Sequence, residues 1–309
     1  MRIGIILPDP GGTDALARVR DALAQAADDG LASAWMSNIF GLDALTALAV
    51  VGSQVPRIEV GTAVVPTYPR HPVALAQQAL TAALATGGRL TLGIGLSHRL
   101  VIEDMFGYSF DRPVRHLSEY LSALLPLLDG KPVDVKGETL RAAAGLSTPR
   151  LGRVPVLVAA LGPAMLRLAG ALADGTALWM TGPATIRDHT VPTIRAAAEQ
   201  AGRPAPRVVA ALPVRVTGDV EGAHAAANKI FAIYGQLPSY RAMLDREGAA
   251  GPADVAVIGD EQTVAARVAE VAAAGATDFV AAPFAPEGSE DERRTRAFLR
   301  DLAGSGIAG

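Results

Sequence analysis

Short, almost continuous apolar runs alternate with longer amphipathic runs along the whole of this 309-residue chain. Strands that are buried on both faces have this composition, because helices cover both sides of a parallel sheet. The amphipathic runs, such as Thr13–Asp28 and Thr263–Ala274, predict helices, and the glycines that follow them, Gly30 and Gly275, are typical helix ends. The predicted strands are Arg2–Leu7, Ser33–Ser37, Ile58–Val65, Arg89–Gly95, Val154–Ala159, Thr176–Met180, Arg207–Leu212 and Asp278–Ala282.

Eight strand–helix units in a chain of this length predict an α/β fold of the (β/α)8 TIM-barrel type. A doubly wound open sheet is the alternative, because alternation alone does not show that the sheet closes. Two long connections, Leu96–Arg153 after the fourth strand and Val214–Ala276 after the seventh, predict insertions. The first should hold a helix over Arg112–Leu128 and a small hairpin, and the second should hold extra helices. We find no repeat or low-complexity linker, so we expect one domain over residues 1–309.

Composition excludes several classes of protein. The formal net charge is −3 and the charges are scattered, so no basic stripe suggests a nucleic-acid partner. Cysteine is absent, which excludes disulfides, thiolate nucleophiles and cysteine-ligated metals. The longest uncharged apolar stretch, Val154–Leu166, falls short of the roughly 20 residues of a membrane span. The N-terminal apolar run is too short for a signal peptide, so we expect a cytoplasmic protein that binds neither membranes nor nucleic acid.

Active sites of parallel barrels lie at the C-terminal ends of the strands. In this sequence those positions offer few ionisable side chains, namely Asp9, Arg70, His71 and His98. The histidines form no HxH or HExxH pair, so we expect no metal site, and neither a GxSxG motif nor a strand-end lysine is present. Such a site favours chemistry that a cofactor supplies and the protein orients.

Three features at the strand ends each have two interpretations. Gly93 and Gly95 in LGIGLSH either let the backbone approach a phosphate or permit close packing in the barrel. Gly162 and the proline after it place a helix N-terminus that is either an anion site or an ordinary turn. Trp35 and Trp179 are either core aromatics or platforms for a bound ring.

Four stretches together resemble the luciferase-like monooxygenase superfamily, bacterial (β/α)8 barrels that use flavin or deazaflavin. They are GTAVVPTYPRHPVALAQQ, GGRLTLGIGLSH, AALGP and ADGTALWMTGP, and their order and spacing match across essentially the whole chain. The sequence is more similar to the deazaflavin branch, the oxidoreductases that use coenzyme F420. The resemblance implies coenzyme F420 as cofactor, with FMN as the alternative.

In this family the third strand ends in a bulge, commonly with a non-proline cis peptide, that supports the bent deazaflavin ring. By position the resemblance places that bulge at Ala63 and Val64. The prolines after it would hold the bulge against the barrel, and Arg70 and His71 would anchor the turn and the next helix.

The resemblance also implies cofactor contacts at other strand ends. Ser97 and His98 would lie by the phosphate or lactyl arm, and Asn38 would face the pyrimidine side of the ring or the substrate. The remaining implied contacts are the backbone of Ala160, Leu161 and Gly162 and the side chains of Trp179, Met180 and Thr181.

Three positions depart from the pattern of the deazaflavin-dependent glucose-6-phosphate dehydrogenases. Ile39 stands in place of a histidine, His98 in place of a catalytic glutamate, and Pro183 in place of a lysine for the sugar phosphate. The sequence therefore does not support sugar dehydrogenase activity, and it favours a small, mostly apolar substrate.

The leading hypothesis is an oxidoreductase that transfers a hydride between coenzyme F420 and such a substrate. His98, with Asn38 as the second catalytic candidate, would donate or accept a proton, or else would bind the coenzyme phosphate. The alternatives are an FMN-dependent monooxygenase with a reductase partner, and a non-catalytic coenzyme-binding protein. Relatives are often dimers, so a homodimer is expected.

Overall fold

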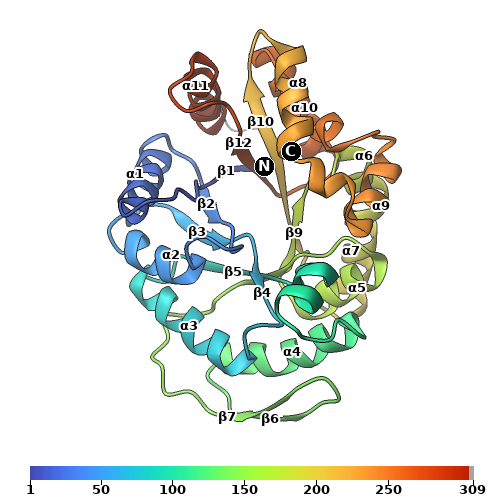
Figure 1. The fold of residues 1–309 in the computed structure, drawn as a ribbon. Helices are drawn as coiled ribbons and strands as arrows, with labels where there is room; N and C mark the ends of the chain where they lie inside the picture. Colours follow the sequence, from blue (N-terminus) through green and yellow to red (C-terminus); the bar gives the residue numbers. More distant parts are fainter. Residues whose placement is uncertain (306–309) are drawn as a thin grey trace.

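Eight parallel strands close into a barrel in the computed structural model, which describes residues 1–305 (Figure 1). The order around the barrel is β1-β2-β3-β5-β8-β9-β10-β12, and β12 pairs with β1 again. The pairing of β9 with β10 closes the sheet, so the open-sheet alternative is wrong. The barrel strands are β1 Arg2–Ile6, β2 Ser33–Met36, β3 Glu59–Thr62, β5 Leu90–Gly95, β8 Val156–Val158, β9 Gly175–Trp179, β10 Arg207–Val216 and β12 Asp278–Pro283.

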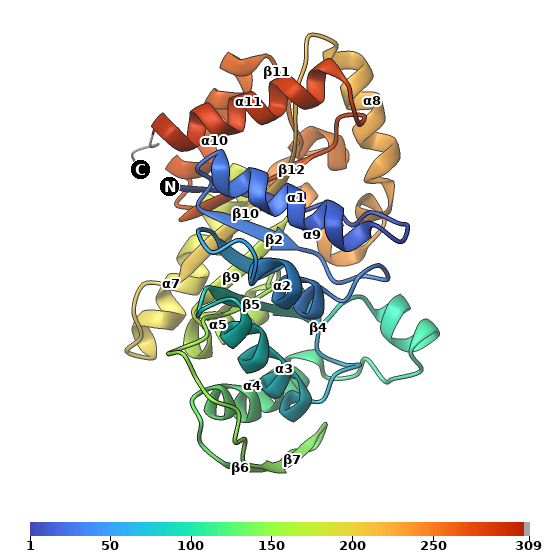
Figure 2. The same cartoon turned by 90° about the vertical axis from the view of Figure 1, so that its left-hand side faces the viewer.

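Helices surround the barrel, and their apolar faces form one continuous core with the outward-facing strand residues. Figure 2 shows the barrel from the side, with the start of β1 near the label N and the helix labelled α8 at the opposite side. The main helices are α1 Ala15–Asp28, α2 Ala44–Gly52, α3 Pro72–Ala85, α4 Pro113–Leu128, α5 Pro163–Leu172, α7 Val191–Gln200, α8 Val220–Ile230, α9 Pro238–Glu247, α10 Glu261–Ala273 and α11 Glu290–Ser305. Among the described residues, no helix is both long and apolar enough to cross a membrane.

The third strand differs from its prediction because it is divided. β3 ends at Thr62, and a second short strand, β4 Val65–Pro66, continues the pairing with β5. The peptide bond between Ala63 and Val64 is cis, so the bulge expected from the family resemblance is confirmed.

Both predicted insertions are present. The first holds a short π-helix, η1 Val101–Met105, then α4 and the expected hairpin of β6 Val133–Lys136 and β7 Arg141–Ala144. The second holds α8, the turn η3 Ala232–Gly235, α9, the turn η4 Pro252–Val255 and the strand β11 Val257–Gly259. We did not predict β11, whose three residues pair with an extension of β10 beyond Leu212.

The N-terminal end of the barrel is closed by a partly buried ion-pair network, in which Arg2 and Arg207 both pair with Glu59 and Asp278. The Arg207 guanidinium donates to both carboxylate oxygens of Asp278, at 2.9 and 2.6 Å, and to Glu59 Oε1 at 2.7 Å. Above it the indole of Trp35, only 1% exposed, fills the interior, and a Cβ on Gly61 would lie 2.3 Å from its Cε3 atom. Trp35 is therefore a core residue, and the space for a ligand begins on its other side.

Candidate active site

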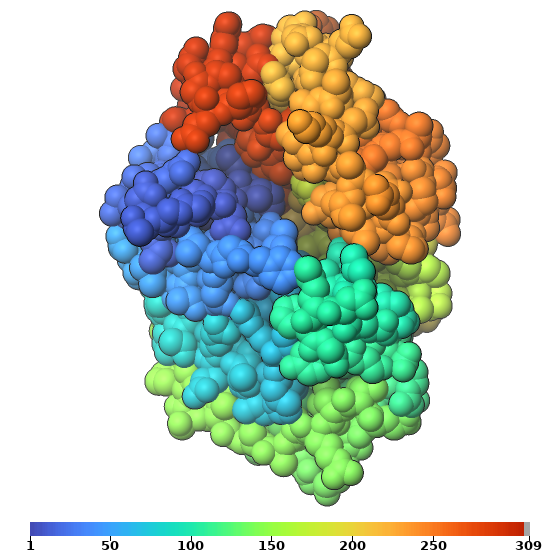
Figure 3. All heavy atoms as spheres, viewed as in Figure 1, coloured from blue at the N-terminus to red at the C-terminus, as the bar shows by residue number. Residues whose placement is uncertain are grey.

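The C-terminal face of the barrel is hollowed at its centre (Figure 3). The blue N-terminal segments, the sea-green segment near residue 100 and the orange second insertion surround this recess. Under it one apolar cluster fills the barrel interior, with Trp35, Leu157, Val209, Ala211 and Val280 buried and Ile6, Ala63, Ala177 and Trp179 packed against them. Ala63, Ala177 and Trp179 are only half-buried, so these side chains border open space.

The two glycines of LGIGLSH lie within β5 itself. A Cβ on Gly93 would lie 2.0 Å from the Thr62 carbonyl oxygen, and one on Gly95 would lie 2.7 Å from Val64 Cγ2. Both glycines are thus required for the close approach of β5 to the bulge, which supports the packing interpretation. The loop residues that can face a ligand come after them, at Ser97 and His98.

A chain of aromatic rings covers one side of the mouth. The His98 imidazole lies 5.7 Å from the Tyr240 ring of α9, measured between centroids. Tyr240 lies 5.0 Å from Tyr234, which lies 5.8 Å from Trp179 at the end of β9. Trp179 also meets Phe231 at 5.9 Å, so the second insertion packs directly on the strand ends.

Sequence reasoning missed Phe231, Tyr234 and Tyr240, although it placed their helices over the mouth. The sequence feature that could have indicated them is the segment FAIYGQLPSY, residues 231–240, which groups three aromatic residues in the insertion after the seventh predicted strand. We name Ser97, His98, Trp179, Tyr234 and Tyr240 the mouth cluster.

The polar groups of the mouth cluster are neutral. Burial lowers the pKa of the His98 imidazole below its ordinary value, so the ring is uncharged at neutral pH. Burial, with a smaller contribution from Tyr234, raises the pKa of the Tyr240 hydroxyl, which therefore keeps its proton. These groups can donate or accept hydrogen bonds, but none is a strong acid or base without a ligand.

Asn38 follows β2 at the same end of the barrel. Its side-chain carbonyl accepts a hydrogen bond from the Ala44 backbone N–H at 3.0 Å, which connects it to the start of α2. This bond fixes the side chain and leaves the amide nitrogen and the second lone pair of the carbonyl oxygen for a ligand.

The other predicted site residues lie at the expected strand ends but differ in orientation. Met180, with a left-handed φ of 53°, is fully buried beneath the second insertion, against Leu244. Ala160 is part of the core between strands and helices, and the Thr181 hydroxyl donates to the Trp179 carbonyl at 3.2 Å. For Met180 and Ala160, only the backbone remains as a candidate contact with a ligand in the recess.

The turn from β8 to α5 matches its prediction. Gly162 is the N-cap of α5, which begins at Pro163, and no atom lies within 4 Å of the Cβ that Gly162 lacks. The Leu161 carbonyl is held by His189 Nε2 at 2.8 Å. The N–H groups at this helix start lie at the ligand end of the barrel.

Arg70 and His71 are structural, as expected. The Arg70 guanidinium pairs with Asp43, which caps α2, and His71 caps α3 by accepting from the Val73 N–H at 3.3 Å. The other ring nitrogen of His71 donates to the Arg141 carbonyl at 2.8 Å. These contacts fix the loop that follows the bulge.

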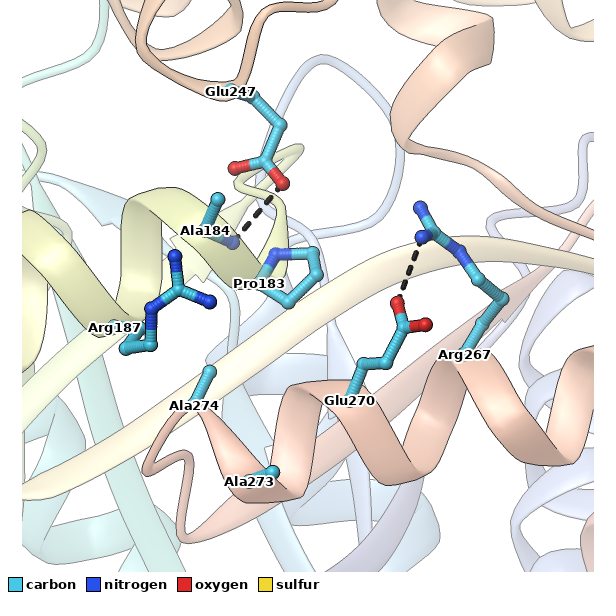
Figure 4. Close-up of a pocket in the computed structure, with 8 residues that line it drawn as sticks. All are labelled: Pro183, Ala184, Arg187, Glu247, Arg267, Glu270, Ala273 and Ala274. Atoms are coloured by element: carbon cyan, nitrogen blue, oxygen red, sulfur yellow. Dashed lines mark hydrogen bonds and ion pairs between the residues drawn. The ribbon is translucent and has the colours of Figure 1, made fainter.

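Glu247 fixes the second insertion over the mouth (Figure 4). Its carboxylate accepts from the backbone N–H groups of Ala184 at 3.1 Å and Thr185 at 2.7 Å, at the start of the helix that follows β9. The cavity of about 330 Å³ beside it has Arg267 and Glu270 in its wall, and these two pair with each other at 2.8 Å. Its charged groups are satisfied, so we regard Glu247 as an anchor for α9.

The recess fits the flat, uncharged ring of a flavin or a deazaflavin. The half-buried Ala63, Ala177 and Trp179 border it, and the neutral His98 and Tyr240 lie at its mouth. Within residues 1–305 no three His, Cys, Asp or Glu side chains are grouped so that they could hold a metal ion.

Comparison with known proteins agrees with this geometry. The family model for luciferase-like monooxygenases matches residues 1–307. A putative coenzyme F420-dependent oxidoreductase of Mycobacterium tuberculosis is 31% identical over 169 residues, which are 50% of this chain and 49% of that protein.

Two further proteins are similar over nearly the whole chain. One is the coenzyme F420-dependent tetrahydromethanopterin reductase of Methanopyrus kandleri; its curated sequence is 25% identical over 331 residues, covering 91% of this chain and 92% of its own. Its structure superposes with a TM-score of 0.82 at 21% identity, covering 99% and 98% of the two chains. The second is the oxygenating component of a diketocamphane monooxygenase of Pseudomonas putida, whose structure was solved in complex with FMN. It superposes with a TM-score of 0.76 at 16% identity, covering 98% of this chain and 97% of its own. The chain therefore belongs to the luciferase-like monooxygenase family.

Proposed function

We propose that this protein is an oxidoreductase that uses the deazaflavin coenzyme F420 to transfer a hydride to or from a small, mostly apolar organic substrate. The observation that carries the proposal is the recess at the C-terminal strand ends, which is bordered by the apolar side chains Ala63, Ala177 and Trp179 and has the neutral His98 at its mouth. Such a site supplies shape and orientation, and it leaves the redox chemistry to a bound cofactor. Two of the relatives described above are named as F420-dependent enzymes, which supports this choice of cofactor.

Each part of the recess has a proposed role toward the cofactor. Ala63 and Val64 would support the ring from the bulge, and Trp179 would line its edge. Ser97 and the N–H groups at Gly162 would bind the phosphate arm, because both lie at strand ends on the ligand side. Bound F420 supplies a carbon, C5, that accepts or releases a hydride.

His98 is the proposed proton carrier. Its imidazole is neutral because burial lowers its pKa, so it can accept a proton from a substrate alcohol or pass one on from solvent. The Tyr240 ring beside it excludes water from one side of the imidazole. The apolar rings of Phe231 and Tyr234 favour a substrate without charge.

A titration tests the cofactor. The purified protein is titrated with oxidised F420 and, separately, with FMN, while the fluorescence of each chromophore is followed. Saturable micromolar binding of F420 and weak binding of FMN are expected. Tight binding of FMN without F420 binding, together with oxygen consumption in the presence of a flavin reductase, would instead establish an FMN monooxygenase.

A single-turnover measurement then tests the reaction. Protein loaded with reduced F420 is mixed with a panel of ketones, imines and activated alkenes, and the absorbance of oxidised F420 is followed. Tight F420 binding without turnover of any substrate in either direction would identify a non-catalytic coenzyme-binding protein. The homodimer and the cytoplasmic location remain predictions.

A further inference from the structure

Two aromatic side chains from distant parts of the chain meet at the mouth of the recess. His98 follows β5, and Tyr240 lies on α9, in the insertion between β10 and β12. Around the barrel, β5 and β10 are separated by β8 and β9 on one side and by four strands on the other. The contact between the two rings therefore passes over the ends of β8 and β9, where the sea-green and orange segments adjoin in Figure 3.

The polar atoms of both side chains lack a partner in the protein. Within residues 1–305 the Tyr240 hydroxyl makes no hydrogen bond, and neither does the His98 imidazole. Four side-chain polar atoms of this part of the chain are both unpaired and fully enclosed, and none of the four belongs to Tyr240 or His98. Both side chains are half-buried. The hydroxyl and the imidazole therefore keep surface that a ligand can reach.

The Tyr240 ring is held in place although its hydroxyl is unpaired. Tyr234 packs edge-on against it, with 5.0 Å between centroids and 77° between planes, and Tyr234 in turn meets Trp179. Glu247 fixes α9 through the two backbone N–H groups described above. A donor that packing already holds loses little freedom when it binds an acceptor, so this hydroxyl is preorganised for a ligand.

The chemistry of the pair suits a ligand oxygen that becomes negative. Burial raises the pKa of Tyr240, so its hydroxyl is a hydrogen-bond donor at neutral pH, and the His98 imidazole beside it is uncharged. The mouth cluster contains no carboxylate, which a cationic imine would favour. When a hydride adds to a carbonyl carbon, one electron pair of the C=O bond moves to the oxygen, and a fixed neutral donor stabilises the charge that develops there.

We propose that Tyr240 is a catalytic residue whose hydroxyl donates a hydrogen bond to the substrate oxygen, and that the substrate is a ketone or aldehyde, or the alcohol formed from it. The inference rests on the proposed function, which supplies the hydride. Tyr240 keeps its own proton. The proton that completes the alcohol comes from solvent through His98, whose ring contacts that of Tyr240.

An ionised phenol tests the donor without any turnover. para-Nitrophenolate presents a negative oxygen on a flat ring, and nitrobenzene has the same ring without that oxygen. Calorimetric titration of the full chain, with and without saturating F420, should give saturable, millimolar or tighter binding of para-nitrophenolate. Tyr240→Phe should weaken this binding by about tenfold or more, because it removes a hydrogen bond to a charged oxygen. The binding of nitrobenzene, the affinity for F420 and the melting temperature should stay unchanged.

Tyr68→Phe is the matched control. It also deletes an unpaired tyrosine hydroxyl, but the hydroxyl of Tyr68 is enclosed, so no ligand can touch it. This variant should bind para-nitrophenolate as the wild type does. With a ketone that the loaded protein reduces, Tyr240→Phe should lower the rate of hydride transfer by about a hundredfold, the usual effect of removing one donor to a developing oxyanion, and Tyr68→Phe should not.

Failure of this inference and failure of the proposed function give different results. If the wild type and Tyr240→Phe bind para-nitrophenolate alike, or if neither binds it, Tyr240 is not the donor, whether or not F420 binds. An equal loss of affinity in Tyr68→Phe would also overturn the inference, because the effect would not depend on contact with the probe. If F420 does not bind but Tyr240→Phe alone loses affinity for the probe, the donor is confirmed and the cofactor proposal is wrong.

Discussion

The imidazole of His98, at the end of β5, lies against the ring of Tyr240 on α9, with 5.7 Å between the ring centroids. These residues are far apart in the sequence, and their contact joins the barrel to the second insertion. Because the insertion covers the imidazole, burial lowers the pKa of His98. The geometry of the site thus has a consequence for stability that can be measured.

The first prediction concerns pH. Burial lowers the folded pKa of His98, so the unfolded chain, with an ordinary histidine pKa of about 6.5, binds the proton more tightly. The stabilising contribution is therefore complete above that unfolded pKa and is lost as pH falls through the lower folded pKa. Urea unfolding from about pH 8 to pH 5 should show a smaller loss of stability in His98→Asn than in the wild type. Parallel curves for the two proteins would contradict the burial of a neutral imidazole.

The second prediction concerns Gly61 under Trp35. A Cβ at this position would lie 2.3 Å from Trp35 Cε3, so the indole must shift inside a filled barrel. Gly61→Ala should lower the free energy of unfolding by about 1–3 kcal/mol, the range for overpacking. The control is Gly11→Ala, where no atom lies within 4 Å of the added methyl group. Equal unfolding free energies for the two variants would show that Trp35 has room to move.

The third prediction separates the two ends of the barrel. Arg207 is held by Asp278 and Glu59, so Arg207→Ala leaves these two carboxylates with the more exposed Arg2 as their remaining cation and should destabilise the protein by about 2–3 kcal/mol. Arg57→Ala, which breaks an exposed pair with Asp28, should cost about 1 kcal/mol or less. Below the melting temperature, folded Arg207→Ala should bind F420 with wild-type affinity, because ligands of TIM barrels bind at the opposite, C-terminal end of the strands. A large loss of affinity in the folded variant would contradict this separation.

The barrel could be predicted from the sequence because its strands are apolar on both faces. A continuous apolar run such as Val154–Ala159 is typical of a strand in a parallel sheet that helices cover. The two insertions could be predicted because two of the connections between these apolar runs are much longer than the others. The aromatic contacts could not be predicted in the same way, because the position of Tyr240 depends on how α9 sits on the barrel. That position is set by the bonds from Glu247 to Ala184 and Thr185, which lie 63 and 62 residues away in the chain.

Three further details depend on local geometry. β11 has only three residues, too few for a hydrophobic period to be visible. Trp35 could be a platform or a core residue on sequence grounds, and its contact with Gly61 decides in favour of the core. The cis bond at Ala63 and Val64 came from the family resemblance, since no propensity of alanine or valine indicates it.

The fourth prediction concerns the anchor of α9. Glu247→Ala removes the acceptor for two backbone N–H groups at a helix start, and we expect a loss of about 1–2 kcal/mol. Hydrogen exchange over 238–247 should accelerate, because α9 loses two of its hydrogen bonds to the segment that follows β9. Glu270→Ala is the control, since Glu270 lines the same cavity but pairs only with Arg267 on its own helix. Unchanged exchange in Glu247→Ala would mean that apolar packing alone holds the helix.

The fifth prediction concerns Ser97, which has a left-handed φ of 61°. A non-glycine residue in this region costs roughly 1–2 kcal/mol, so Ser97→Gly should stabilise the protein by up to about that amount. The same change removes the hydroxyl that we propose for the phosphate arm, so F420 affinity should fall. Ser97→Ala separates the two effects, because it loses the hydroxyl but keeps the backbone strain: its affinity should fall as in Ser97→Gly, while its stability should stay near that of the wild type. If Ser97→Gly binds F420 as tightly as the wild type, the hydroxyl has no part in cofactor binding, and a gain in stability alone would identify Ser97 as a strained position without a ligand role.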